Sequence, residues 1–171
     1  ARAYYISTFL RRTIGASVTS TSPLEAPSWI PQWETSKADV CGAIASQPST
    51  FKIVTKVRDN PAFLRDWVEH HSRIVGPQNL VILDNMSADP GMFEIYEQLR
   101  GAAVIVRFNT FHNRVHRVHE YPELYEALRN STRYYQVLDA DERLVHVSDD
   151  LVHSAGPQIV DRLAEMDLPV I

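Results

Sequence analysis

The fold is constrained most strongly by an alternation, from residue 51 onward, of short apolar runs with longer segments of helical period. The runs are five to seven residues long and are apolar, β-branched or aromatic in character, which favours strands. They are FKIVTKV (51–57), NLVILD (79–84), AAVIVRF (102–108) and YYQVL (134–138). Strands that alternate with helices pair in parallel, so this order predicts an α/β fold with a mostly parallel sheet and helices on both faces.

The segments between the runs carry helix signals. Apolar residues recur at helical spacing over 63–75, after a cap and a proline at Asn60-Pro61 and before Gly76. Similar patterns predict helices over 92–99, 122–130 and 158–166. In such folds ligands bind outside the carboxyl ends of the strands, so candidate site residues are expected there.

Residues 1–50 differ in character from the rest of the chain. The stretch 18–31 is rich in Ser, Thr and Pro, a composition that disfavours regular helix and buries little surface. We therefore expect residues 1–50 to be an N-terminal arm or linker, docked through Trp29, Ile30 and Trp33. A single domain is expected over residues 51–171.

Charge and cysteine content argue against a nucleic-acid partner and against an oxidising compartment. The net charge is −4, from 17 basic and 21 acidic residues, so no nucleic acid is expected as a partner. The one cysteine, Cys41, cannot form an internal disulfide, which favours a reducing compartment. No apolar run approaches the ~20 residues of a membrane span. A cytoplasmic or membrane-associated location is expected, with membrane association only through segments outside this chain.

Acidic residues stand at the ends of three predicted strands, in Arg58-Asp59, in Asp84-Asn85 and in Asp139-Ala140-Asp141. Two carboxylates one residue apart face opposite ways within a strand, but they can converge where the chain turns at its end. Converging carboxylates repel unless a cation lies between them, and hard dications prefer oxygen ligands. Asp139 and Asp141 are therefore candidate ligands for Mn²⁺ or Mg²⁺. The alternative is a turn capped by these carboxylates.

The remaining motifs point less clearly to a function. Neither a G-x-G-x-x-G fingerprint nor a P-loop is present. The pair His70-His71 is interpreted as helix packing and helix surface. The basic segment 107–119 admits three interpretations: a zinc site, a cover for a diphosphate or a solvated loop. Its cationic and titratable residues are Arg107, His112, Arg114, His116, Arg117 and His119.

Four blocks in order resemble a known family. They are VRDN (57–60), LRDWVEHH (64–71), VILDNMSAD (81–89) and YQVLDADERL (135–144), with Gly76 between the second and third. Together they resemble the nucleotide-sugar-dependent glycosyltransferases of the GT-A fold, in the family 2-like and family 92-like group. The resemblance spans residues 51–145 and implies a Rossmann-like nucleotide-binding half.

This resemblance also implies roles for single residues. Residues 56–59, including Lys56, Arg58 and Asp59, would line the nucleotide pocket of a donor, most simply a UDP-sugar. Asp84 would hold the uracil or ribose. Asp139 and Asp141 would bind Mn²⁺ or Mg²⁺ and, through it, the diphosphate. The expected reaction is inverting transfer of the sugar to a hydroxyl acceptor, such as a saccharide.

Two departures from the family pattern leave alternatives open. Asp59-Asn60 stands where Asn-Glu is usual, and the chain ends about 30 residues after the D-x-D-E block, so the acceptor half is expected to be missing. Glu142 would support the metal ligands or face the acceptor, and Glu142 and Asp149 are the candidate catalytic groups. The alternatives are a non-catalytic nucleotide- or sugar-binding module and a metal-dependent phosphohydrolase or nucleotidyltransferase.

Overall fold

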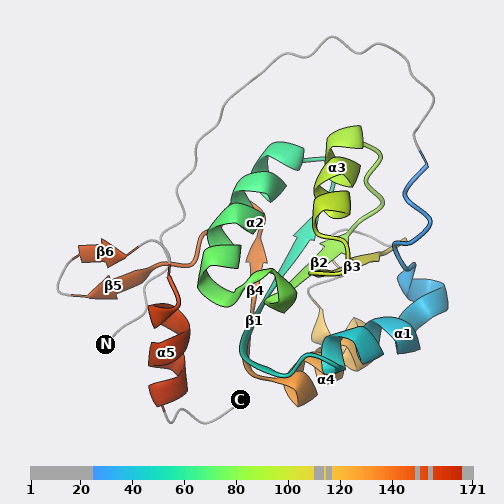
Figure 1. Cartoon of the computed structure of the whole chain (residues 1–171). Coiled ribbons are helices and arrows are strands. Elements are labelled where there is room, and N and C mark those ends of the chain that lie inside the picture. The colour runs from blue at the N-terminus through green and yellow to red at the C-terminus, as the bar shows by residue number, and fades with distance from the viewer. Residues whose placement is uncertain (1–24, 110–113, 115–116, 149–150, 154–155, 167–171) are drawn as a thin grey trace.

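The structure is a computed structural model of the chain that describes residues 25–109, 114, 117–148, 151–153 and 156–166 (Figure 1). Its helices are α1 (Trp33–Ala45), α2 (Pro61–Val75), α3 (Pro90–Gln98), α4 (Pro122–Ser131) and α5 (Gln158–Glu165). Its strands are β1 (Ser49–Val57), β2 (Leu80–Asp84), β3 (Val104–Arg107), β4 (Thr132–Asp139), β5 (His146–Ser148) and β6 (Leu151–His153). Short 3-10 turns lie at η1 (Pro77–Asn79) and η3 (Val118–Glu120).

Four strands form one all-parallel sheet in the order β3-β2-β1-β4, and β5 and β6 form a separate antiparallel pair. The predicted α/β class is confirmed, and the arrangement is Rossmann-like. The strands end level with one another, because Val57 pairs with Asp84, Lys56 with Asp139, and Asp84 with Arg107. The acidic residues at the ends of these strands therefore lie together at the carboxyl end of the sheet.

Helices cover both faces of the sheet, as predicted. Figure 1 shows α2 and α3 on one side and α1 and α4 on the other. Alternate strand residues divide between the two layers: Val54, Val81 and Val106 pack with α1 and α4, whereas Ile82 and Ile105 pack with α3. All five residues of β2 are buried, which explains its uninterrupted apolar sequence.

The region predicted as an N-terminal arm differs from that expectation in its described part. Trp33, Val40 and Ile44 of α1 are buried in the core beside α4. Ahead of the helix, the Pro31 carbonyl accepts a hydrogen bond from the Arg107 amide, so residues 31–32 extend the β3 edge. The domain core thus begins before residue 51. The expected docking through Ile30 and Trp33 is present, since both are buried.

No helix in the described part of the chain is long and apolar enough to cross a membrane. The segment after β4 contains the β5–β6 pair, which the sequence analysis did not predict, and α5, which it did. Ile159 of α5 is buried against the α2 side of the sheet with Phe51 and Leu138. Helix α5 thus covers part of the sheet near its outermost strand, β4.

Candidate functional site

The sheet order creates a topological switch point between β1 and β4. From β1 the chain moves to β2 and β3 in one direction, and it then returns to place β4 on the other side of β1. In open α/β sheets a crevice forms outside the carboxyl ends of the two strands that flank such a point. The candidate site lies there.

A cavity of about 630 Å³ occupies this position. That volume lies within the range of small-molecule sites, which is roughly 300–1,000 Å³. Its lining comes from the end of β1, the start of α2 and the turn after β4: Lys56, Val57, Arg58, Asp59, Asn60, Phe63, Asp139, Ala140 and Asp141. Five residues predicted for the site are therefore brought together: Lys56, Arg58, Asp59, Asp139 and Asp141.

Lys56 and Asp139 form an ion pair at the base of the cavity. The two residues are register partners on β1 and β4, so their side chains share a face of the sheet. Lys56 Nζ lies 3.5 Å from Asp139 Oδ1, and the lysine side chain is only 11% exposed against 50% for the aspartate. One of the two carboxylates thus already has a protein cation beside it.

The turn after β4 is closed by Glu142 and braced by Arg143. The Asp139 amide donates to Glu142 Oε2 over 3.0 Å, and the Glu142 amide donates to the Asp139 carbonyl over 2.9 Å. Arg143 Nη1 donates to the carbonyls of Ala140 and Glu142. The expected alternative of a capped turn is thus present in another form, because the cap is Glu142 rather than either aspartate.

Asp59 joins the cavity to the neighbouring loop. Its Oδ1 accepts hydrogen bonds from the amides of Ala88 and Asp89, and its own amide donates to Ser87 Oγ. Asp59 adopts φ 46°, a left-handed conformation that aspartate tolerates better than most side chains. Arg58 Nε lies 3.7 Å from Asp59 Oδ2, so a basic and an acidic side chain stand side by side at the cavity rim.

Asp84 was predicted to contact a nucleotide, but it is fully buried and is not among the cavity residues. Its Oδ2 accepts from Arg107 Nε over 3.0 Å, and its Oδ1 accepts from the Tyr96 hydroxyl over 2.9 Å. The Ser87 amide also points at this carboxylate. Burial and the neighbouring carboxylate raise the pKa of Tyr96, so the phenol stays a hydrogen-bond donor. In this structure Asp84 ties β2, β3, α3 and the loop together.

The described part of the basic segment pairs with acidic side chains of the chain itself. Arg107 is bonded to Asp84, and Arg114 Nε and Arg117 Nη1 lie 3.6 and 2.9 Å from Glu120 carboxylate oxygens. His119 is exposed beside the same glutamate. None of these four residues lines the cavity. The predictions for His112, His116 and Asp149 concern positions outside the described residues.

The donor set at the cavity fits a hard dication only in part. Asp139 and Asp141 supply carboxylate oxygens and line an open cavity, which leaves room for a ligand to complete the coordination shell. However, Lys56 competes for Asp139. Within the described residues there is no group of three or more His, Cys, Asp or Glu that could hold a metal ion by itself. A metal here would be shared with a bound anion.

Sequence reasoning missed the place of Phe63 in the cavity wall and the backbone hydrogen bonds of His70 and His71. Phe63 lies in the first turn of α2 and is 39% exposed at the cavity wall, where its ring offers an apolar face. In the sequence Phe63 belongs to the apolar pattern predicted for this helix, so no local signal set it apart. His70 and His71 were interpreted as helix packing and helix surface, and His71 is fully buried. In addition, both ring Nε2 atoms meet the backbone of Leu144, just beyond the acidic turn.

We compared the chain with known proteins by sequence and by structure. No sequence profile of a protein family, no curated protein and no solved structure matches the chain. Fold and cavity together define an α/β protein with a Rossmann-like sheet and an acidic cavity at its switch point.

Proposed function

We propose that the chain binds a nucleotide diphosphate-linked sugar, a UDP-sugar in the simplest case, in the cavity between β1 and β4 and transfers the sugar to a hydroxyl acceptor. The observation that carries this proposal is the convergence of Lys56, Arg58, Asp59, Asp139 and Asp141 at one switch point. These residues come from segments about 80 positions apart in the chain. They combine basic groups for phosphates with paired carboxylates for a dication.

Five of the lining residues have a role under this proposal. Asp139 and Asp141 would hold Mn²⁺ or Mg²⁺, which when bound neutralises charge on a departing diphosphate. Lys56 and Arg58 attract the phosphate oxygens. Phe63 offers a ring face on which a base or a sugar can stack. In the transfer, an acceptor oxygen bonds to the anomeric carbon while the bond from that carbon to the diphosphate oxygen breaks, and the hydroxyl proton passes to a base.

The identity of that base separates the proposal from its main alternative. Glu142 was a candidate, but its carboxylate accepts a hydrogen bond from the Asp139 amide and so serves the turn. Asp149 lies outside the described residues. This use of Glu142 favours a second candidate function, a module that binds the nucleotide ligand without turnover. The two candidates share the cavity and differ only in catalysis.

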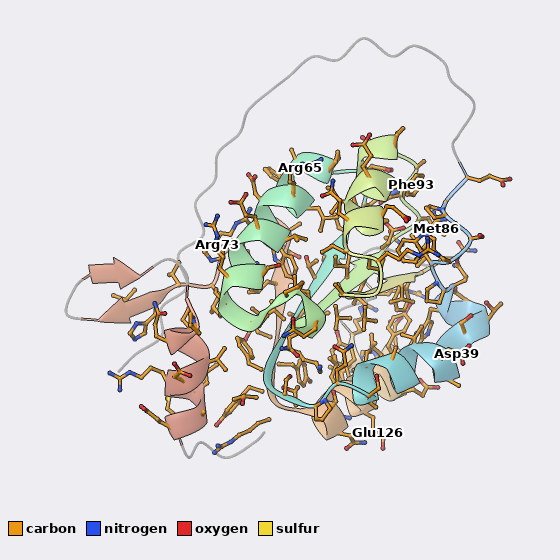
Figure 2. The ribbon with its side chains drawn as sticks, in the orientation of Figure 1. Asp39, Arg65, Arg73, Met86, Phe93 and Glu126 are labelled. Atoms are coloured by element: carbon orange, nitrogen blue, oxygen red, sulfur yellow. The ribbon has the colours of Figure 1, made fainter. Side chains whose placement is uncertain are left out.

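Calorimetry with UDP, GDP and dTDP, in the presence and absence of Mn²⁺, tests the binding shared by both functions. We expect UDP to bind only weakly without Mn²⁺, and Asp141→Asn to reduce the metal-dependent affinity at least tenfold. Asp39→Asn is the matched control, because Asp39 lies on α1, on the far side of the sheet (Figure 2). Equal affinities in wild type and Asp141→Asn would remove the metal from the proposal.

Turnover assays then separate the candidate functions. Slow release of UDP from a UDP-sugar with Mn²⁺, faster with a hydroxyl acceptor, is the result expected of a transferase. Binding of UDP without release from any UDP-sugar would instead favour the binding module. Hydrolysis of phosphoesters that lack a nucleotide would favour the third expectation, a metal-dependent phosphohydrolase.

A further inference from the structure

Two adjacent histidines of α2 contact both backbone polar groups of one residue, Leu144, near the acidic turn. His70 Nε2 lies 2.7 Å from the Leu144 carbonyl oxygen, and His71 Nε2 lies 3.2 Å from the Leu144 amide nitrogen. The pair is more than 70 residues from Leu144 in the chain. Leu144 itself follows Asp141 by only three positions.

The chemistry of these two backbone groups fixes which nitrogen of each ring carries a proton. A carbonyl oxygen only accepts, so His70 must present Nε2–H to Leu144. An amide only donates, so Nε2 of His71 must be the unprotonated acceptor. Its other nitrogen, Nδ1, then carries the hydrogen and donates to the Trp67 carbonyl 2.9 Å away, one helical turn back. His71 is thus a neutral imidazole with both nitrogens in use.

The surroundings keep His71 in that neutral form. Its side chain is fully buried, with the Trp67 ring centroid 4.5 Å from its own. Burial, and then the adjacent His70, lower the pKa of His71 to about 3. Burial lowers the pKa of His70 as well; the hydrogen bond to the Leu144 carbonyl opposes this shift, and the cations Arg143 and Arg73 add to it. Burial also lowers the pKa of Arg143, whereas the carboxylates of Asp66 and Asp141 raise it.

We propose that His70 and His71 are positioning residues that clamp the backbone of Leu144 from both sides of its Cα and thereby fix the acidic turn 139–142 in the cavity. The turn is held at three successive points. Glu142 closes it, Arg143 braces its carbonyls, and the histidine clamp anchors the residue that follows. The part played by the turn in ligand binding rests on the proposed function, whereas the clamp itself does not.

Amide hydrogen exchange of the ligand-free protein, followed by NMR, tests the clamp directly. We expect the Leu144 amide to exchange about five- to tenfold faster in His70→Ala and His71→Ala, the effect of losing one hydrogen bond. Glutamine can present a donor or an acceptor at the position of Nε2, so His70→Gln and His71→Gln should restore slow exchange. Glu69→Gln is the control and should leave the rate unchanged, because Glu69 is an exposed residue of α2 that pairs with Arg73, which is labelled in Figure 2.

The half-buried His70 provides the variant most certain to fold. Unchanged Leu144 exchange in folded His70→Ala would overturn the clamp, whatever His71→Ala does. A second arm measures UDP affinity with Mn²⁺, where His70→Ala should weaken binding by about the same factor and His70→Gln should recover it. If wild type binds and His70→Ala binds equally well, positioning of the site is overturned. If wild type does not bind, the proposed function fails, and the exchange result still decides on the clamp.

Discussion

Lys56 supplies the charge that competes most directly with a metal at Asp139. From the sequence, the two carboxylates are expected to lie close together only with a bound cation between them. In the structure a lysine ammonium already stands 3.5 Å from one of them. A dication and Lys56 therefore compete for the same oxygen, unless an anionic ligand draws the lysine to itself. The position of Lys56 would then report whether a phosphate is bound.

Replacing Lys56 with methionine should strengthen binding of Mn²⁺ alone and weaken binding of UDP. Removal of a partly exposed ion-pair partner changes the energy of a charge at Asp139 by about 1 kcal/mol, or about fivefold in affinity. Mn²⁺ titration followed by electron paramagnetic resonance measures the first effect and calorimetry the second. Lys37→Met, at an exposed pair with Glu123, is the control. Weaker Mn²⁺ binding in Lys56→Met would contradict competition.

At the scale of elements, variants of Glu142 show whether this residue only caps the turn after β4 or also acts as the catalytic base. Glu142→Gln keeps an acceptor for the Asp139 amide, so metal-dependent UDP binding and any turnover should stay within about twofold of wild type. Glu142→Ala removes the acceptor and should cost about 1 kcal/mol of stability, measured by urea unfolding. Loss of turnover in Glu142→Gln with unchanged UDP binding would instead identify Glu142 as the base.

Most elements were predictable from the sequence because their signals are local. NLVILD reads as a strand buried on both faces, and Asn60-Pro61 caps α2 through a hydrogen bond from the Phe63 amide to the Asn60 side chain. By contrast, α1 was missed, because its cap residue Gln32 makes no capping bond and only three of its residues are buried. Its signal comes from packing against α4, which is distant in the chain.

The candidate site, likewise, was predictable only where local sequence patterns locate its residues. Strand ends locate residues at the carboxyl end of a parallel sheet, so the sequence predicts that Lys56, Asp59 and Asp139 lie near one another, and all three line the cavity. That rule says nothing about which carboxylates are already satisfied. The bonds of Asp84 with Arg107 and Tyr96 depend on how β3 and α3 pack, and the clamp on Leu144 joins α2 to the segment after β4. Such long-range pairs leave no local pattern.

For the whole molecule, the buried ion pair between Asp84 and Arg107 should be a major determinant of stability. Arg107→Ala would leave a buried carboxylate without its cation and should lower the free energy of unfolding by about 3–5 kcal/mol. Urea unfolding measures this loss. Arg100→Ala, at an exposed pair with Glu97, should cost less than about 1 kcal/mol. Similar losses in the two variants would contradict the central structural role of Asp84.

The stability of the fold should also depend on pH through His71. Its pKa is about 3 in the folded chain, against ~6.5 when unfolded, so the unfolded state binds more protons between these values. The contribution of neutral His71 to the free energy of unfolding is therefore complete above about pH 6.5, and it is lost as the pH falls from there toward 3. Between pH 7 and 5 the wild type should lose about 2 kcal/mol more than His71→Gln in urea unfolding. Equal losses would show that His71 titrates normally.

The central claim is that the turn 139–142 and the end of β1 bind a dication together with a nucleotide diphosphate. Paramagnetic broadening of backbone amide NMR signals by Mn²⁺ locates the ion directly, with and without UDP. We predict that UDP sharply increases broadening at residues 56–60 and 139–142, and that Asp141→Asn abolishes the increase. Broadening that is independent of UDP, or that centres on other acidic surfaces such as those of Asp39 and Glu126 (Figure 2), would contradict the claim.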